Sequence, residues 1–273
     1  MPFDAHATLA DALLSPLVDA CRVIMHTRDN DLVVDRKSDD SPVTEADRRA
    51  EAILSAALQR ILPDVPIIAE ESAAEGRTPA LKDTFILLDP LDGTRDYAAG
   101  RSDFTVNIGI VDQGRPVFGL IYAPARSELF ITPSAGAAVE AALDWRNPPH
   151  ALRDLALKPL RVAANKFGHL RAVVSRRECG PDFDDRLANL GVSTRTAASS
   201  AVKFGLIARG EADVYPRFGP TCEWDTAAGE AIVKAAGGSV TALDGTPLVY
   251  GKAAAKFLNG PFIARGRTGS PQE

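Results

Sequence analysis

The sequence predicts a mixed α and β fold whose two halves follow different patterns. Short apolar runs separated by turn residues dominate the first half, which also has two amphipathic helical patterns near its start. Beyond about residue 168, strand and helix patterns alternate along the chain. Segregated strands are typical of an α+β arrangement, and alternation is typical of an α/β arrangement. We therefore expect an α+β half over residues 1–165 and an α/β half over residues 166–273.

Two helices are predicted before residue 65. The Ser15-Pro16 pair is typical of a helix start, and apolar residues follow it at helical spacing until about Thr27. The second helix is predicted to begin near Thr44, because Thr44-x-x-Asp47 resembles a capping box, and to end at Pro63. A short strand is expected between the two helices, at residues 32–34.

Apolar runs of strand length follow the second helix. The strands predicted in the first half cover residues 65–71, 84–90, 103–111, 116–124 and 127–132. The turn Asp112-Gln113-Gly114 joins two of these runs and indicates a β-hairpin. Residues 141–168 have no clean period, and we interpret them as a linker or an excursion between the halves.

The second half is predicted to alternate between strands and helices. Its expected strands are residues 171–175, 192–196, 212–216, 239–242 and 261–265, and its expected helices are residues 181–191, 199–210 and 224–238. This alternation predicts a second sheet with helices packed against it.

The overall composition excludes several classes of function. The net charge is −5, which argues against binding to a nucleic acid polymer or an anionic membrane. Cys21, Cys179 and Cys222 lack the paired spacing of a disulfide framework or a zinc site. No apolar run approaches the roughly 18 residues of a membrane span, and the N-terminus lacks the basic region of a secretory signal. We expect a cytoplasmic protein.

Acidic residues gather at the ends of the predicted elements. The run "LLDPLDGTRD" places Asp89 and Asp92 at the tip of an apolar strand. Two carboxylates about 4 Å apart repel by roughly 4 kcal/mol at an effective dielectric constant of about 20, so a cation between them is expected. Glu70 ends another strand and Asp225 begins a helix. Carboxylate oxygens are the ligands that Mg²⁺ prefers, and this number of acids suits two ions.

Each acid also has a simpler interpretation. Asp47 fits the last position of a capping box, and Asp92-Gly93 is a common turn dipeptide. Asp225 is favoured at a helix start by the helix dipole, and Glu70 fits a solvated loop acid. Gly93 and Thr94 lead into a helix start, where free backbone N–H groups bind phosphate.

Four motifs resemble those of the inositol monophosphatase-like phosphatases, in the order of that family. The motifs are "SPVTEAD" at 41–47, "IIAEES" at 67–72, "LLDPLDGT" at 87–94 and "EWDTAAGEAIVKAAGG" at 223–238. The resemblance implies a layered αβαβα fold, shared with fructose-1,6-bisphosphatase, and a magnesium-dependent, lithium-sensitive phosphatase. It implies that residues 1–165 carry most metal ligands and that residues 166–273 complete the metal site and the substrate pocket.

Within this family the sequence is most similar to the CysQ-type 3′(2′),5′-bisphosphate nucleotidases. The segment "YPRFGPT" at 215–221 carries much of that similarity. It implies hydrolysis of the 3′-phosphate of adenosine 3′,5′-bisphosphate to AMP in sulfur metabolism. The alternative is a phosphatase for inositol monophosphate or another small polyol phosphate, and a third hypothesis is a non-catalytic phosphate- or metal-binding protein.

The resemblance also implies roles for individual residues. One ion would be held by Glu70, Asp89 and the backbone carbonyl of Leu91, and a second by Asp89, Asp92 and Asp225, with two or three Mg²⁺ ions per site. The water nucleophile would be activated by Glu70 together with Thr94 and Asp47. Asp96 is interpreted as a surface acid and Glu71 as lying outside the ligand shell.

Substrate binding would involve two groups of residues. Backbone N–H groups of Gly93, Thr94 and Arg95 would bind the scissile phosphate. The candidates for the second phosphate are Ser199 and Ser200 as a helix N-cap, with Lys203, Arg176 and Arg217 as cations. Simple capping and a solvated lysine would explain the same pattern at 199–203. The expected partner is a small nucleotide, and the chain is expected to be a monomer or homodimer. Some relatives associate with the cytoplasmic face of the inner membrane, but the sequence shows no basic amphipathic helix.

Overall fold

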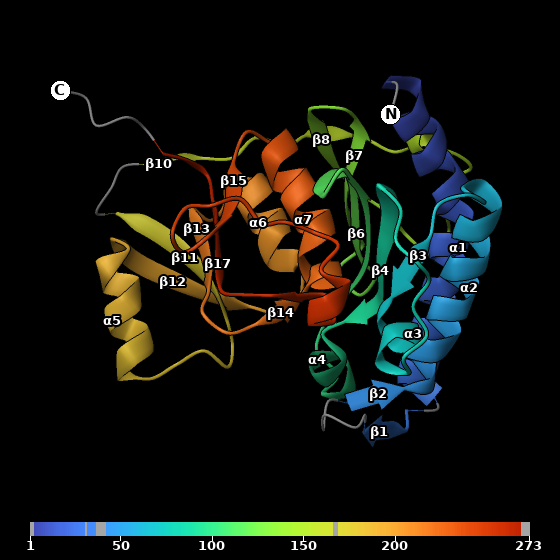
Figure 1. Ribbon diagram of the computed structural model, residues 1–273, viewed down its shortest axis with the longest axis horizontal. Coiled ribbons are helices and arrows are strands. Elements are labelled where there is room, and N and C mark those ends of the chain that lie inside the picture. The colour runs from blue at the N-terminus through green and yellow to red at the C-terminus, as the bar shows by residue number, and fades with distance from the viewer. Residues whose placement is uncertain (1–2, 31, 37–41, 166–168, 269–273) are drawn as a thin grey trace.

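The protein is built of alternating layers of helix and sheet. A computed structural model describes residues 3–30, 32–36, 42–165 and 169–268. Figure 1 shows the order of the layers: α1 and α2, a large sheet, α6 and α7, a smaller sheet, and α5. The predicted layered αβαβα fold is therefore confirmed.

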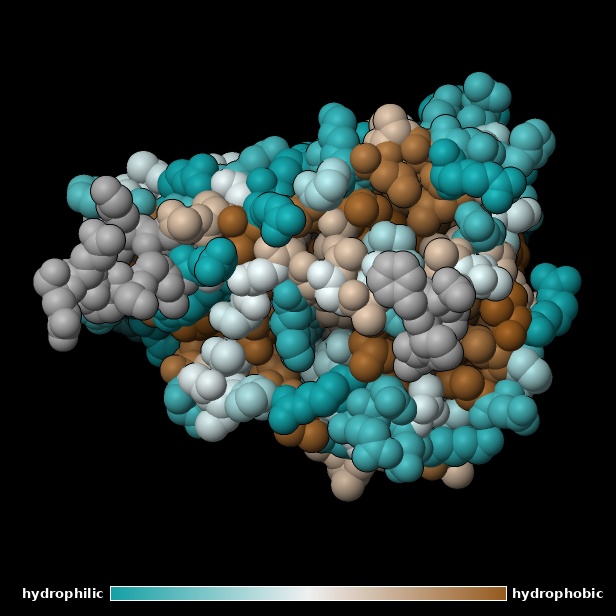
Figure 2. All heavy atoms as spheres, turned by 90° about the horizontal axis from the view of Figure 1, so that it is seen from above, coloured by the Kyte–Doolittle hydropathy of each residue, from teal (hydrophilic) through white to brown (hydrophobic). Residues whose placement is uncertain are grey.

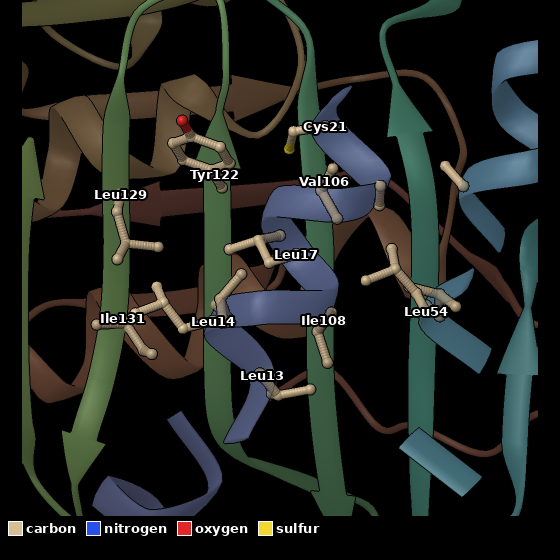
Figure 3. Close-up of a cluster of buried hydrophobic side chains, with 14 of the residues drawn as sticks. Leu13, Leu14, Leu17, Cys21, Leu54, Val106, Ile108, Tyr122, Leu129 and Ile131 are labelled. Atoms are coloured by element: carbon tan, nitrogen blue, oxygen red, sulfur yellow. The ribbon is translucent and has the colours of Figure 1, made fainter. Parts of the chain in front are cut away.

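The first helix, α1 (Phe3–Asn30), is longer than the sequence predicts. Pro16 lies inside it, so the Ser15-Pro16 pair does not mark its start. Leu9 and Leu13 are buried against the large sheet, and this burial extends the helix beyond the local start signal. Figure 3 shows Leu13 and Leu17 of α1 lying over the strands of that sheet.

The second helix, α2 (Glu45–Ile61), begins as predicted. Thr44 accepts a hydrogen bond from the N–H of Ala46, and Asp47 accepts one from the N–H of Thr44, which completes the capping box. The strand before it, β1 (Val34–Arg36), lies two residues later than expected and pairs with β2 (Pro42–Thr44).

The large sheet has seven strands in sequence order. They are β3 (Ile67–Ala69), β4 (Thr84–Asp92), β5 (Thr105–Asp112), β6 (Arg115–Ala123), β7 (Glu128–Ser134), β8 (Ala137–Ala142) and β9 (Lys158–Pro159). β3 is parallel to β4, and the other pairs are antiparallel. The short helices α3 (Glu70–Ala74) and α4 (Thr94–Ala98) directly follow β3 and β4. The hairpin predicted at residues 112–114 is confirmed.

The segment predicted as an excursion contributes structure of its own. It contains the end of β8, the short helix η1 (Leu152–Asp154), β9 and β10 (Ala164–Asn165). Leu152, Leu160 and Val162 are buried, so this segment covers parts of the hydrophobic core. Residues 166–168 lie outside the described part of the chain.

The smaller sheet has five strands in the order β12-β11-β13-β17-β15. The elements of this half are β11 (Leu170–Ser175), α5 (Pro181–Asn189), β12 (Val192–Ala198), α6 (Val202–Ala208), β13 (Val214–Arg217), β14 (Thr221–Cys222), α7 (Glu223–Ala235), β15 (Ser239–Ala242), η2 (Ala253–Ala255), β16 (Leu258–Asn259), β17 (Phe262–Arg265) and β18 (Arg267–Thr268). The predicted alternation of strands and helices is confirmed.

The central helix α7 packs against β4, β5 and β6 of the large sheet. Gly119 allows this approach, because a Cβ there would lie 2.2 Å from the carbonyl oxygen of Ala228. One hydrophobic cluster includes Phe85 and Leu87 of the large sheet together with Phe204 and Phe262 of the second half. The two halves therefore share a core.

The outer surface mixes hydrophilic and hydrophobic residues. Figure 2 shows both kinds interleaved on the face seen from above. Within the described ranges, every helix is too short or too polar to span a lipid bilayer. The expected cytoplasmic location stays a prediction.

Candidate active site

Three predicted metal ligands converge where the large sheet meets α7. Glu70 is the first residue of α3, Asp89 lies in β4, and Asp225 lies in the first turn of α7. One carboxylate oxygen from each residue lies within 4.8 Å of the other two. Asp92, at the end of β4, lines the same cavity as Glu70 and Asp225.

A β-bulge brings Asp89 and Asp92 together. Asp89 pairs with Asn107 and Asp92 with Thr105, so three steps along β4 match two steps along β5. Side chains three positions apart in a regular strand face opposite sides, and one extra residue returns them to the same side. Pro90 lies in the bulge and has no backbone N–H to be left unpaired. The bulge thus explains why "DPLD" ends this strand.

Burial and mutual repulsion shift the titration of these acids. The pKa of Asp89 lies well above its usual range, first because the carboxyl is buried and then because Glu70, Asp92 and Asp225 surround it. Burial, with Asp92 and Glu70 nearby, raises the pKa of Asp225 to about 8. Asp89 Oδ2 is also buried without a hydrogen-bond partner among the described residues. A divalent cation would neutralise this charge and occupy the unpaired oxygen, so the donor set fits a metal that prefers oxygen ligands.

Asp47 connects the start of α2 with Thr94. Its Oδ2 accepts hydrogen bonds from the N–H and the hydroxyl of Thr44, at 2.7 and 2.6 Å. Its Oδ1 lies 3.1 Å from Thr94 Oγ1, which also lies 3.1 Å from the carbonyl oxygen of Leu91. The one hydroxyl hydrogen of Thr94 serves one of these acceptors at a time. Asp47 is therefore both a capping residue and a partner of Thr94.

A cavity of about 340 Å³ opens beside the acids. Its lining includes most of the predicted substrate residues, namely Gly93, Thr94, Arg95, Ser199, Ser200, Lys203 and Arg217. Gly93 has φ +90°, and a Cβ there would lie 3.0 Å from the carbonyl oxygen of Asp103, so glycine suits this turn. One side of the cavity is thus acidic, and cationic side chains form part of the rest.

Comparisons with known proteins identify the family. Residues 8–262 match the model described as the inositol monophosphatase family. The protein belongs to the inositol monophosphatase family.

Individual relatives agree with this result. A 3′(2′),5′-bisphosphate nucleotidase CysQ from Salmonella typhimurium is 35% identical over 227 residues, covering 83% of this chain and 86% of the relative. The crystal structure of CysQ from Bacteroides thetaiotaomicron has a TM-score of 0.75 and 33% identity, covering 96% of this chain and 98% of that chain. An inositol monophosphatase from Anabaena has a TM-score of 0.70 and 26% identity, covering 96% of this chain and 91% of that chain. The resemblance stated from the sequence motifs is confirmed.

Ser199 and Ser200 do not cap α6 in this family member. The N-cap of α6 is Ala201, which makes no side-chain cap bond, because the helix starts two residues later than the serines suggest. Ser200 has φ +56° and donates its hydroxyl hydrogen to Asp92 Oδ2 at 2.7 Å. Lys203 is buried, its Nζ donates to the carbonyl oxygen of Ser200 at 2.8 Å, and burial lowers its pKa to about 8. The alternative of a solvated lysine is therefore wrong.

The structure also places two arginines differently from expectation. Arg176 forms an ion pair with Asp103 at 2.6 Å and does not line the cavity, whereas the next residue, Arg177, does. Both arginines lie in the turn that follows β11, which the hydrogen bond from the N–H of Glu178 to the carbonyl oxygen of Ser175 closes, so the alternation of a strand does not decide which one faces the cavity. The sequence "RR" does not indicate which one.

Three acidic or amide side chains near the site were misassigned or missed. Asp96 is buried and paired with Arg101, so its interpretation as a surface acid is wrong. Asp103 is buried and accepts hydrogen bonds from Arg176 and Arg126. Asn107, opposite Asp89 in the ladder, has a buried amide with no partner among the described residues. The positions of Asp103 and Asn107 depend on contacts distant in the sequence, whereas Asp96 pairs with Arg101 only five residues further on.

Proposed function

We propose that this protein is a magnesium-dependent 3′(2′),5′-bisphosphate nucleotidase. It removes the 3′-phosphate of adenosine 3′,5′-bisphosphate and gives AMP and inorganic phosphate. The observation that carries the proposal is the cluster of Glu70, Asp89 and Asp225, which opens into a cavity with cationic side chains. A nucleotide with two phosphates suits this cavity, because one phosphate can lie at the metal ions held by the acids and the other at the cationic side chains. The relatives named CysQ are nucleotidases of this kind.

The metal-binding residues would be the four acids and one carbonyl. We assign Glu70, Asp89 and the Leu91 carbonyl to one Mg²⁺, and Asp89, Asp92 and Asp225 to another. Bound divalent cations would supply Lewis-acid activation of the phosphate and of the attacking water. The buried and half-buried acids of the cluster are costly to keep ionised together without these cations.

The remaining chemistry would come from this chain's own side chains. Thr94 can donate its hydrogen to Asp47, which leaves its oxygen lone pairs free to accept a hydrogen from water in the cavity. Glu70, which lines the same cavity, would accept the proton that the water loses. The first N–H groups of α4, at Thr94 and Arg95, have no acceptor within the helix and would bind oxygens of the scissile phosphate.

The proposal is tested by phosphate release from the purified protein with Mg²⁺. Adenosine 3′,5′-bisphosphate and inositol 1-phosphate are compared at equal concentrations, with Asp89→Asn as the control. We expect preference for the nucleotide and loss of activity in the variant. Preference for inositol 1-phosphate would overturn the nucleotidase assignment, whereas the proposed metal ligands would still stand. A folded protein that binds Mg²⁺ and hydrolyses neither compound would overturn the catalytic role.

A further inference from the structure

A second cavity adjoins the one that contains the acids. It has a volume of about 480 Å³, and it shares Arg95, Ser175, Arg177 and Arg217 with the first cavity. The acids Glu70, Asp92, Asp96 and Asp225 line only the first of these two cavities, and Glu178 lines only the second, so no acid is among the shared residues. The boundary between the cavities is therefore the most cationic part of the site.

Two of these arginines have no acidic partner. The side chains of Arg95, in α4, and Arg177, which follows β11, make no hydrogen bond or ion pair with another described residue. Other arginines nearby are paired: Arg176 with Asp103, Arg101 with Asp96, and Arg217 with Glu178 at 3.7 Å. The uncompensated positive charge of the shared wall thus lies on Arg95 and Arg177.

The two guanidinium groups also repel each other. The pKa of Arg177 is lowered, first by partial burial and then by the charge of Arg95. The carboxylate of Asp96 acts on Arg177 in the opposite direction, but its own ion-pair partner is Arg101. Two cations placed together are stabilised by an anion, and guanidinium groups bind phosphate oxygens with two parallel hydrogen bonds. A phosphate monoester carries about two negative charges at neutral pH, which matches two arginines.

We propose that the side chains of Arg95 and Arg177 bind the second phosphate of the bisphosphate substrate, the one that is not hydrolysed. The proposal rests on the proposed function, and it assigns the preference for bisphosphates over monophosphates to these two residues. The scissile phosphate lies at the acids and the α4 N–H groups, and the other phosphate lies at the wall shared by the two cavities.

The test compares substrates with and without the second phosphate. kcat/KM is measured for adenosine 3′,5′-bisphosphate and adenosine 3′-phosphate in the wild type, Arg95→Met and Arg177→Met. We expect each variant to lose about 10- to 100-fold on the bisphosphate, the effect of losing hydrogen bonds to a charged group. Hydrolysis of the monophosphate by Arg177→Met should change less than about twofold. Arg177→Lys should recover only part of the loss, because it keeps the charge and loses the planar fork.

Two further measurements make the result specific. Arg195→Met removes an exposed arginine that pairs with Asp184 outside both cavities, and it should leave both rates unchanged. In the double variant Arg95→Met/Arg177→Met the losses should not add, if both side chains hold one phosphate. Equal losses on both substrates, or an unchanged preference in the variants, would overturn the proposal.

Binding of adenosine 5′-phosphate separates this proposal from the proposed function. Calorimetry on the wild type and Arg177→Met should show affinity reduced by the same 10- to 100-fold in the variant. If the wild type does not hydrolyse the bisphosphate, the nucleotidase assignment fails, and the binding result still decides the role of Arg177. Equal affinity in the two proteins would exclude that role.

Discussion

Ser200 Oγ donates a hydrogen bond to Asp92 Oδ2 at 2.7 Å, and this bond joins the two halves of the chain at the acidic cluster. The same hydroxyl also contacts Thr105 Oγ1. Ser200 holds this position with φ +56°, a left-handed conformation that favours glycine. A residue of the second half thus fixes the orientation of a carboxylate that we assign to the metal.

We expect Ser200→Ala to raise the Mg²⁺ concentration needed for half-maximal activity by about tenfold, because Asp92 loses a charge-assisted hydrogen bond. Titration of activity with Mg²⁺ measures this change. Ser200→Gly is the matched control. It removes the same hydroxyl but relieves the left-handed backbone, so its Mg²⁺ requirement should rise equally while its stability exceeds that of the alanine variant by about 1 kcal/mol. An unchanged Mg²⁺ requirement in both variants would contradict the role of the bond.

The two functions of Asp47 should be separable. Thr44→Val removes the cap hydroxyl and leaves Thr94 beside Asp47, so it should lower the free energy of unfolding by about 1 kcal/mol and leave kcat within about threefold. Thr94→Val should lower kcat by about 100-fold or more, the usual effect of losing a group that positions a proton. Urea unfolding and steady-state kinetics on both variants check this. Similar loss of activity in the two variants would show that capping and catalysis are not independent here.

Stability without metal should fall as the pH rises from about 4 to about 8. The pKa of Asp225 is raised to about 8 in the folded protein, so over this range the unfolded chain releases the proton first and is favoured. The stabilisation that protonated Asp225 provides is complete below the pKa of this residue in the unfolded chain. It is lost as the pH rises to the pKa of this residue in the folded protein. Saturating Mg²⁺ binds the folded, ionised site and should offset the loss.

Thermal unfolding at pH 5 to 8, in a chelator and in Mg²⁺, measures this effect. Asp225→Asn carries no titrating group, so the difference between wild type and variant isolates this residue. In the chelator the variant should be the more stable protein near pH 8, although it binds Mg²⁺ more weakly. A difference that does not vary with pH would exclude the raised pKa.

The contact between α7 and the large sheet depends on glycine. A Cβ at residue 119 would lie 2.2 Å from the backbone oxygen of Ala228, which cannot move without shifting the helix. Gly119→Ala should therefore lower the free energy of unfolding by about 2–3 kcal/mol. Gly260→Ala is the control, because no atom lies within 4 Å of its added Cβ, and it should change stability by less than about 0.5 kcal/mol. Equal urea midpoints for the two variants would contradict the close packing.

The spacing of apolar residues predicted most of the helices and strands, because this spacing depends on which face of a single helix or strand is buried. The capping box at Thr44 and the hairpin at residues 112–114 are complete within a few residues, and both are confirmed. The predicted start of α1 at Ser15-Pro16 was wrong, because Leu9 is buried against the sheet and the helix therefore begins before this pair. Tertiary contacts of this kind leave no local trace in the sequence.

The convergence of the acids was more predictable from the sequence than the positions of the cationic side chains. Glu70, Asp89 and Asp225 lie in motifs that can be compared directly with the family, and the structure brings them within 4.8 Å. Which of Arg176 and Arg177 faces the cavity depends on the turn that follows β11. The side chain of Arg176 pairs with Asp103 and does not line the cavity. Asp96 is buried although it lies in the first turn of a short helix, and its partner Arg101 remains exposed.

The position of α7 between the two sheets determines whether the two halves of the chain can unfold separately. This helix carries Asp225 at its first turn and packs against β4, β5 and β6, while the cluster around it includes Phe85 and Phe204 from opposite halves. A break near residue 165 would expose that apolar surface on both fragments. We therefore expect the halves to unfold in one cooperative step, with the slowest amide hydrogen exchange in α7 and in the strands that face it.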